Sequence, residues 1–244
     1  MSFDQVREDW TTLGARDPLW AVYVDPDKRD VGWDTEQFFE LGRADVAVAR
    51  TWLARLGLPT TWTKVLDFGC GVGRLSQALA AHAESVVGVD VSEPMLATAR
   101  TFDSTGGKCD FVLNEVPNLS RFADGTFDLV YTELVLQHLP AAVIEAYLAE
   151  FMRVLRPGGV AVLQCTTRPL WTVKGAIWRF APHWLVRIAQ QKLLRYPAPM
   201  RMTAMATERV DAVISAHGGA IVDSVTEDVP TTHWASTRYV IQVP

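Results

Sequence analysis

Three glycines alternate with other residues directly after a short apolar run, in the order Gly69, Gly71 and Gly73. Glycine tolerates positive φ angles and lets a ligand approach the backbone closely. In dinucleotide-binding enzymes such a turn holds a pyrophosphate at the start of a helix. Here Arg74 stands where the third glycine of that fingerprint belongs, and Asp67 adds a carboxylate that would repel phosphate. The turn therefore predicts a ligand with a positively charged amino group, bound directly or through water.

A second carboxylate, Asp90, ends the next apolar run of the chain. A carboxylate at the end of a strand can accept hydrogen bonds from both hydroxyls of a ribose. Val91 and Met95 follow and could pack on the face of an adenine. Glu115 and Val116 come after a third apolar run, where a carboxylate and a backbone N–H could bind the adenine edge. Together these residues predict a nucleoside with an amino-acid-like tail and no phosphates.

Two titratable residues follow the fourth apolar run, where a reacting group would lie. His138 is the first candidate for a general base, because imidazole titrates near neutral pH. The alternative is a structural histidine that bonds the backbone or caps the helix expected near Pro140. Glu133 is the second candidate, and His183 and His233 lie in segments that could cover the site.

The elements that must position these residues alternate between strands and helices from residue 64 onward. Strands are expected over residues 64–68, 86–90, 109–113, 127–132, 159–166, 220–226 and 235–243. Helices are expected over residues 73–83, 93–102, 141–155 and 204–217. This rhythm predicts a three-layer, doubly wound α/β fold with a mostly parallel sheet covered on both faces.

Segments of different character flank and interrupt this pattern. Residues 1–60 are expected to form a helical lid, in which Asp34 caps a helix that runs toward Leu56. Residues 61–244 form the main domain, and residues 168–203 form a helical insertion on the substrate side after the fifth strand. Three tryptophans of the insertion could stack on an acceptor ring or anchor the insertion to the domain: Trp171, Trp178 and Trp184.

Five motifs in order resemble the class I S-adenosylmethionine-dependent methyltransferases. They are VLDFGCGVGR (65–74), VGVDVS (87–92) with Met95, FDLVY (127–131), QHL (137–139) and LRPGG (155–159). The resemblance covers roughly residues 60–166. It implies a seven-stranded sheet whose last strand is antiparallel. It also implies that the donor, S-adenosylmethionine, binds along the carboxyl ends of the strands.

The resemblance also assigns roles to residues of this chain. Gly69 and Gly71 would approach the methionine part of the donor, with Cys70 and Gly73 completing the turn. Asp67 would help hold the amino group of the donor, and Asp90 would hold the ribose. Val91 and Met95 would pack on the face of the adenine. Glu115 and Val116 would bind the edge of the adenine. Arg43 or Arg74 would bind the donor carboxylate. Two departures from the family are Asn114-Glu115, where relatives often have Gly-Asp, and Glu133, a position often small or neutral.

The composition excludes several classes of protein. The 244 residues carry a net charge of −5 and three cysteines, a number and spacing that indicate neither a disulfide framework nor a metal site. We expect no signal peptide and no transmembrane segment, and therefore a cytoplasmic protein that is a monomer or a homodimer. Residues 151–207 contain nine Lys and Arg but no Asp or Glu. These cations either pair with acidic neighbours in the fold or face an anionic partner, and an interfacial helix on anionic lipid is the least favoured interpretation.

The predicted function is methyl transfer from S-adenosylmethionine to a small acceptor, anionic or aromatic, with oxygen as the preferred methylated atom. Alternatives are a nucleic-acid or protein N-methyltransferase and a non-catalytic donor-binding module. Nucleic acid is not the expected partner, because the sequence lacks the Asn/Asp-Pro-Pro-aromatic motif of base-amino methylation. A nicotinamide dehydrogenase is disfavoured by Arg74 and Asp67 in the glycine turn.

Overall fold

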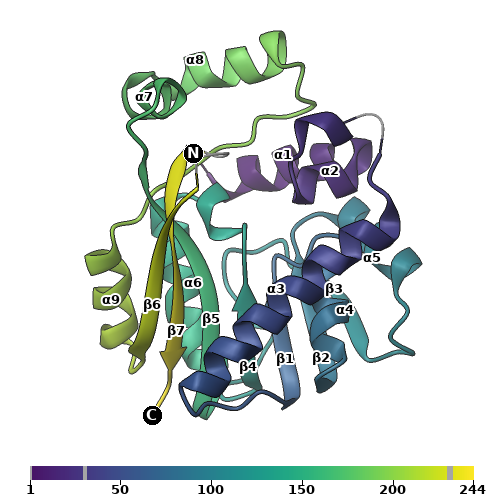
Figure 1. Ribbon diagram of the computed structural model, residues 1–244, viewed down its shortest axis with the longest axis vertical. Helices are drawn as coiled ribbons and strands as arrows, with labels where there is room; N and C mark the ends of the chain where they lie inside the picture. The colour runs from purple at the N-terminus through teal and green to yellow at the C-terminus, as the bar shows by residue number, and fades with distance from the viewer. Residues whose placement is uncertain (1, 30–31, 230–232) are drawn as a thin grey trace.

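The computed structural model describes residues 2–29, 32–229 and 233–244. The strands of this part form one seven-stranded sheet in the order β3-β2-β1-β4-β5-β7-β6 (Figure 1). The strands are β1 (Trp62–Phe68), β2 (Ala83–Asp90), β3 (Cys109–Leu113), β4 (Phe127–Thr132), β5 (Leu155–Pro169), β6 (Ala220–Val229) and β7 (Trp234–Gln242). β7 runs antiparallel to both of its neighbours, and the other pairs are parallel. The predicted α/β fold with an antiparallel last strand is confirmed.

The central strands β1 and β4 carry the residues expected at the site to one edge of the sheet. All six residues of β4 are buried, as are the last four of β1. Such continuous burial is typical of parallel strands covered on both faces. Asp67 pairs in register with Gly88 of β2 and Tyr131 of β4. The carboxyl ends of β1, β2 and β4 therefore meet around Asp67.

Helices cover the two faces of the sheet. α3 (Thr35–Arg55) and α4 (Arg74–Ala80) pack on one face, and α6 (Ala141–Val154) and α9 (Thr207–Ala216) pack on the other. α5 (Glu93–Phe102) packs beside β2 and β3. Figure 1 shows α3 and α4 in front of the sheet and α6 behind it. The predicted cap of α3 is present, since Asp34 Oδ1 accepts a hydrogen bond from the backbone N–H of Gln37 at 2.9 Å.

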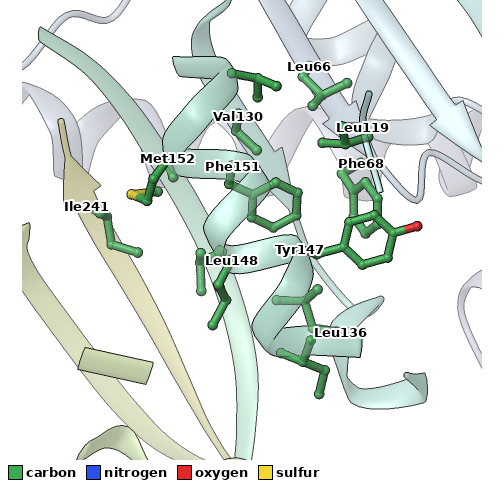
Figure 2. Close-up of a cluster of buried hydrophobic side chains, with 14 of the residues drawn as sticks. Leu66, Phe68, Leu119, Val130, Leu136, Tyr147, Leu148, Phe151, Met152 and Ile241 are labelled. Atoms are coloured by element: carbon green, nitrogen blue, oxygen red, sulfur yellow. The ribbon is translucent and has the colours of Figure 1, made fainter. Parts of the chain in front are cut away.

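The largest buried cluster lies between α6 and the sheet (Figure 2). Tyr147, Leu148 and Phe151 of α6 are at most 1% exposed. The rings of Tyr147 and Phe151 lie 4.4 and 5.0 Å from that of Phe68, the last residue of β1. Burial of such aromatic side chains stabilises the sheet by roughly 1.5–3 kcal/mol for each ring. It also fixes the strand end that leads into the glycine turn.

The remaining helices lie over the carboxyl edge of the sheet. They are α1 (Phe3–Arg16), α2 (Pro18–Val22), α7 (Val173–Phe180) and α8 (His183–Ile188), with short 3₁₀ turns at Pro26–Lys28 and Leu136–His138 and a π-helical turn at Ala189–Leu193. Figure 1 shows α1 and α2 above β1 to β4, and α7 and α8 further out at the top of the molecule. None of the described helices is long and apolar enough to span a membrane.

Several element boundaries differ from the sequence prediction, and two of them border the candidate site or its neighbouring strands. The helix after the glycine turn ends at Ala80 instead of residue 83, because Ala83 already pairs with Trp62 and so begins β2. β5 extends from Leu155 to Pro169, well beyond the predicted 159–166. Its far end is extended by pairing with β7, which reaches Trp234. Long-range pairing, which a local pattern does not contain, accounts for both differences.

Candidate active site

The glycine turn after β1 has a backbone that only glycine fits. Gly69 and Gly71 have φ angles of +73° and +53°, in the left-handed region that side chains disfavour. A Cβ at Gly69 would lie 2.4 Å from a methyl group of Val135, and one at Gly71 would lie 2.7 Å from a methyl group of Val22. The turn is therefore closed in by Val135 after β4 and by Val22 of α2.

Asp90 at the end of β2 anchors this turn. Its two carboxylate oxygens accept hydrogen bonds from the backbone N–H groups of Gly71 and Ser92, each at 2.9 Å. Burial raises the pKa of Asp90, and the two N–H groups oppose that rise. A carboxylate has about four acceptor positions. Two therefore remain for ligand hydroxyls.

Asp67 lies behind the turn and does not form part of the cavity wall. Its side chain is 1% exposed, and one oxygen accepts a hydrogen bond from the Ser76 hydroxyl of α4 at 2.6 Å. The other oxygen has no hydrogen-bond partner among the described residues. Burial raises the pKa of Asp67 from 3.8 to about 7, against the lowering effects of Ser76 and Arg74. A buried acceptor without a partner suits a ligand or water that brings an N–H or O–H donor.

The turn forms the floor of a cavity of about 860 Å³. Met95, with Val91 beside it, lines one side, and Asn114 lines it after β3. The roof comes from the N-terminal helices, where three apolar residues of α1 share one helical face: Phe3, Val6 and Trp10. The wall is mostly apolar with a few polar groups, which is the usual character of a small-molecule site.

A second cavity of about 1470 Å³ adjoins the first. The residues that line both cavities are Val22, Glu133, Leu134 and His138. The second cavity is closed by residues from β5, β6, β7 and the segment that follows α8, including Gln164, Met200, Trp234 and Arg238. Two ligands could therefore meet across one shared wall.

Glu133 contributes a buried carboxylate to this wall. One of its oxygens pairs with Arg238 at 2.6 Å, and the other accepts a hydrogen bond from the Tyr131 hydroxyl at 3.1 Å. Burial raises the pKa of Glu133, while Arg238 lowers it. Arg74 forms a second ion pair nearby, with Asp45, so two acidic and two basic groups alternate around the wall.

His138 presents one ring nitrogen to the shared wall. Nδ1 lies 2.6 Å from the carbonyl oxygen of Arg201. A carbonyl only accepts, so Nδ1 carries the proton and Nε2 is an acceptor. Nε2 lies 3.2 Å from the side-chain nitrogen of Gln137, and Trp10 packs edge-on at 4.9 Å. Burial lowers the pKa of His138 from 6.5 to about 4, so the ring is neutral at pH 7.

The backbone between Glu133 and His138 is strained. Leu134 has a φ angle of +63°, which is uncommon for a residue with a branched side chain, and it lines both cavities. Its N–H donates to the side-chain oxygen of Gln164 on β5 at 2.8 Å. Backbone strain of this kind gathers at functional sites, where the surrounding structure holds it in place.

Residues 65–159 match a family model described as a methyltransferase domain. A ubiquinone biosynthesis O-methyltransferase of Pseudomonas aeruginosa is 34% identical over 140 residues, which are 56% of this chain and 58% of that protein. One from Bordetella pertussis is 32% identical over 130 residues, or 52% of each protein. The chain thus spans little more than half the length of these curated relatives.

Two solved structures share the fold over nearly the whole chain. A magnesium protoporphyrin IX methyltransferase from Synechocystis, solved with bound S-adenosylhomocysteine, has a TM-score of 0.65 at 19% identity and covers 97% of this chain and 98% of its own. An N-methyltransferase from Bradyrhizobium japonicum, solved with the same ligand, has a TM-score of 0.64 at 18% identity and covers 99% and 100%. The chain therefore has the fold of these two methyltransferases, and its residues 65–159 match the methyltransferase-domain family.

Most of the expected site residues of this chain come together around the two cavities. The first cavity contacts eight of them: Gly69, Cys70, Gly71, Asp90, Val91, Met95, Glu133 and His138. Gly73 lies behind the turn, where a Cβ would meet the ring of Phe111 at 2.9 Å. Its conformation positions α4 against β3.

Three expected donor contacts lie elsewhere. Arg43 points outward from α3 and pairs with Glu36 and Glu40 of the same helix. Glu115 is half exposed and pairs with Arg7 at 3.3 Å, and the side chain of Val116 is 47% exposed. These three residues line neither cavity. Each was assigned from its order in the chain, whereas ion pairs direct the side chains of Arg43 and Glu115 in this structure.

Asn114, Arg74 and three residues of α1 lie at the first cavity instead of Arg43, Glu115 and Val116. Asn114 is buried and donates to the carbonyl oxygens of Val116 and Asn118 at 3.0 and 3.1 Å, which fixes the loop beside Met95. Arg74 is 2% exposed, so it lies inside the protein and not on the surface of α4. Its Nε has no hydrogen-bond partner among the described residues. The roof of the cavity could have been predicted from the sequence. Its three apolar residues are spaced so that they lie on one face of a helix: Phe3, Val6 and Trp10.

Two further histidines and the tryptophans are placed as follows. His233 accepts or donates a hydrogen bond with Thr172 at 3.1 Å and lines neither cavity. Trp171 is 75% exposed and stacks with Arg179. The side chains of His183, Trp178 and Trp184 lie outside the described part of the chain.

Proposed function

We propose that this chain transfers a methyl group from S-adenosylmethionine, bound in the first cavity, to an oxygen of a small acceptor in the second. The observation that carries the proposal is the wall shared by the two cavities, formed by Glu133, Leu134 and His138. A displacement reaction needs donor and acceptor in line, and positioning by itself can supply about 7–11 kcal/mol of the barrier. The names of the relatives, O-methyltransferases of ubiquinone biosynthesis, support an oxygen acceptor.

The floor of the first cavity fits the donor. In this proposal the free acceptor positions of Asp90 bind the two ribose hydroxyls, and Val91 and Met95 pack against adenine. Gly69 and Gly71 let the turn adopt the left-handed backbone that borders the methionine part, and side chains there would collide with Val135 and Val22. The unpaired oxygen of Asp67 attracts the amino group through water, since Asp67 lies behind the wall. Arg74, with its unpaired Nε, then faces the carboxylate.

When bound, the donor supplies an electrophilic methyl group on a positively charged sulfur. The apolar roof of Phe3, Val6 and Trp10 excludes water from that centre. His138 gives up its contact with Gln137 and accepts the proton of the acceptor hydroxyl at Nε2, while the Arg201 carbonyl holds the opposite side of the ring. A positioned base contributes about 10²–10⁴-fold. Glu133 stays paired with Arg238 and orients the acceptor.

The lining of the second cavity indicates the class of acceptor. Methionine, tyrosine and tryptophan side chains provide an apolar surface for a ring, and they are Tyr23, Tyr196, Met200, Met202 and Trp234. Arg238, whose side chain is 38% exposed, provides a cation at the edge. We therefore infer a small aromatic acceptor that carries an acidic group. The three cysteines are free thiols, which suits the reducing cytoplasm that we infer as the compartment.

The test is a transfer assay with a donor whose methyl group carries a heavy isotope. The purified chain is incubated with a panel of phenolic acids, catechols and matched aromatic amines, and products are scored by mass gain. Label on a phenolic oxygen, lost in an Asp90→Ala variant, supports the proposal. Label only on amines would assign the chain to N-methylation. Donor uptake in calorimetry without any transfer to the panel would favour a non-catalytic binding module.

A further inference from the structure

The segment from residue 171 to residue 194 exposes apolar side chains to an unusual degree. Among the described residues, fourteen large apolar side chains are exposed, and eight of them lie in this short segment: Trp171, Val173, Ile177, Phe180, Leu185, Ile188, Leu193 and Leu194. We call this set the apolar crest. An exposed apolar patch of this kind marks an interaction surface.

On α7 the crest occupies one side of the helix. Val173, Ile177 and Phe180 are spaced four and three residues apart, which places them on a common face. They are 84, 50 and 73% exposed. An amphipathic helix normally turns its apolar face to the core. Here that face points to solvent, at the outer end of the molecule where Figure 1 shows α7 and α8.

The charges of the basic segment divide into two groups. Four arginines outside the crest pair with carboxylates of the fold: Arg153, Arg156, Arg168 and Arg201. Arg179 and Lys192 of the segment 171–194, and Arg195 directly after it, form no ion pair with a described carboxylate. Thus cations beside the exposed apolar side chains remain available to a partner.

A cavity next to the crest gathers further cations. It is lined by Arg16, Arg29 and Arg195 together with the exposed Leu193 and Leu194. Arg29 donates hydrogen bonds to the carbonyl oxygens of Leu194 and Arg195, which holds Arg195 in a left-handed conformation with φ of +54°. Guanidinium groups bind phosphate well, and the leucines beside them offer apolar contact.

We propose that the apolar crest and its cations dock on the surface of a bilayer that contains anionic lipid. An interfacial helix has this composition: apolar residues on one face, and Lys and Arg that attract anionic headgroups. A second copy of the chain on a twofold axis would bring the same unpaired cations together, which disfavours it. A nucleic acid would leave the apolar side chains without a partner.

Docking has a consequence for the acceptor, and this consequence rests on the proposed function. The chain that continues from the crest supplies Tyr196, Met200 and Met202 to the second cavity. A docked crest therefore brings the acceptor cavity close to the lipid surface. The acceptor class then extends to amphiphilic aromatic molecules that partition into a bilayer.

The test is flotation of the purified full chain with vesicles of phosphatidylcholine, with and without phosphatidylglycerol. We expect binding to the phosphatidylglycerol vesicles only, weakened by high salt. The triple variant Val173→Glu, Ile177→Glu, Phe180→Glu should lose at least about tenfold in partition, and Arg179→Glu with Lys192→Glu should lose about tenfold. The matched controls Val48→Glu and Arg55→Glu alter exposed residues of α3 and should bind as the wild type does.

Three outcomes would overturn the proposal. They are failure of the wild type to bind either vesicle, equal binding to neutral vesicles, and a dimer in sedimentation that the triple variant dissociates. Calorimetry with S-adenosylhomocysteine separates this proposal from the proposed function. The triple variant should keep the affinity of the wild type, and absence of donor binding in every variant would count against the function, not against docking.

Discussion

The proposed donor side and the proposed acceptor side of this chain are built in different ways. The donor side uses residues that lie close together in sequence at the ends of adjacent strands, and its polar groups lock the turn, as Asp90 does with Gly71 and Ser92. The acceptor side is assembled from segments far apart in the chain, such as Tyr23, Gln164 and Arg238. It also borders the apolar crest.

This difference explains which half the sequence describes. A nucleoside donor makes the same demands on every member of the fold, and a short turn with two carboxylates can meet them. An acceptor site is defined by tertiary contacts, so its chemistry becomes visible only when the elements are in place. The family model matches residues 65–159, which contain the glycine turn and Asp90, and so informs that half.

The strongest test of the donor side is Asp90→Ala. Two hydrogen bonds from the ribose to a charged group would be lost, at about 1.5–3 kcal/mol each. We expect S-adenosylhomocysteine to bind about 10²–10⁴-fold more weakly in calorimetry. Asp110→Ala removes an exposed carboxylate of the neighbouring strand β3 and is the matched control. Equal affinity of Asp90→Ala and the wild type for S-adenosylhomocysteine would contradict binding of the ribose by Asp90.

Asp67→Asn tests whether the buried carboxylate favours donor binding while it lowers the stability of the folded protein. The pKa of Asp67 is raised from 3.8 to about 7 by burial. The folded state holds the proton of this carboxyl group more tightly than the unfolded state does. The resulting contribution to the free energy of unfolding is complete below pH 3.8 and is lost as the pH rises through about 7. The free energy of unfolding falls by at most roughly 4 kcal/mol over this range, because each pKa unit corresponds to about 1.4 kcal/mol.

The variant lacks that loss, so its melting temperature should exceed the wild type's above pH 7 and equal it near pH 4. Asn can still accept the hydrogen bond from Ser76. Donor-induced stabilisation should be smaller in the variant, because the negative charge that attracts the amino group is gone. A melting temperature that differs from the wild type's by the same amount at every pH would show that Asp67 does not titrate in this range.

Much of the donor side follows from local sequence patterns. The strand ends and the glycine turn were predicted because apolar runs, glycines and carboxylates each leave a local signature. Arg43 pairs with Glu36 and Glu40 outside both cavities, and its spacing from these residues already favours ion pairs along one helix face. Helix spacing was the better guide.

Burial of Arg74 could not be predicted in the same way. It depends on α3 and α4 packing so closely that a Cβ at Gly42 would lie 2.5 Å from the Arg74 carbonyl oxygen. The second cavity depends in the same manner on β7 pairing with β5. Contacts between elements far apart in sequence leave no local pattern, so these features required the structure.

His138→Gln tests the wall between the two sides. We expect kcat to fall about a hundredfold, the lower end of the range for a general base, since a pKa of about 4 makes the ring a weak base. The wild-type rate should fall only when the pH drops through about 4, where the ring gains its proton. Donor affinity should stay nearly unchanged. His82→Gln, which alters a histidine bonded to Arg50 away from both cavities, is the control. An unchanged kcat in His138→Gln would restrict His138 to a structural role.

The smallest effect is expected for the contact between the glycine turn and the roof. Gly71→Ala and Gly57→Ala each force alanine into a left-handed conformation, at about 1–2 kcal/mol. Only at Gly71 does the new Cβ meet a neighbour, Val22 at 2.7 Å, whereas nothing lies within 4 Å at Gly57. Both variants should therefore lose similar stability in urea unfolding.

Only Gly71→Ala should also weaken donor binding, roughly tenfold or about 1.4 kcal/mol, because it pushes α2 away from the cavity. Adding Val22→Ala removes the methyl groups that collide with the new Cβ and should restore most of the affinity in calorimetry. If the double variant binds no better than Gly71→Ala, the loss comes from the strained turn itself, and the donor side is independent of the helices that cover it.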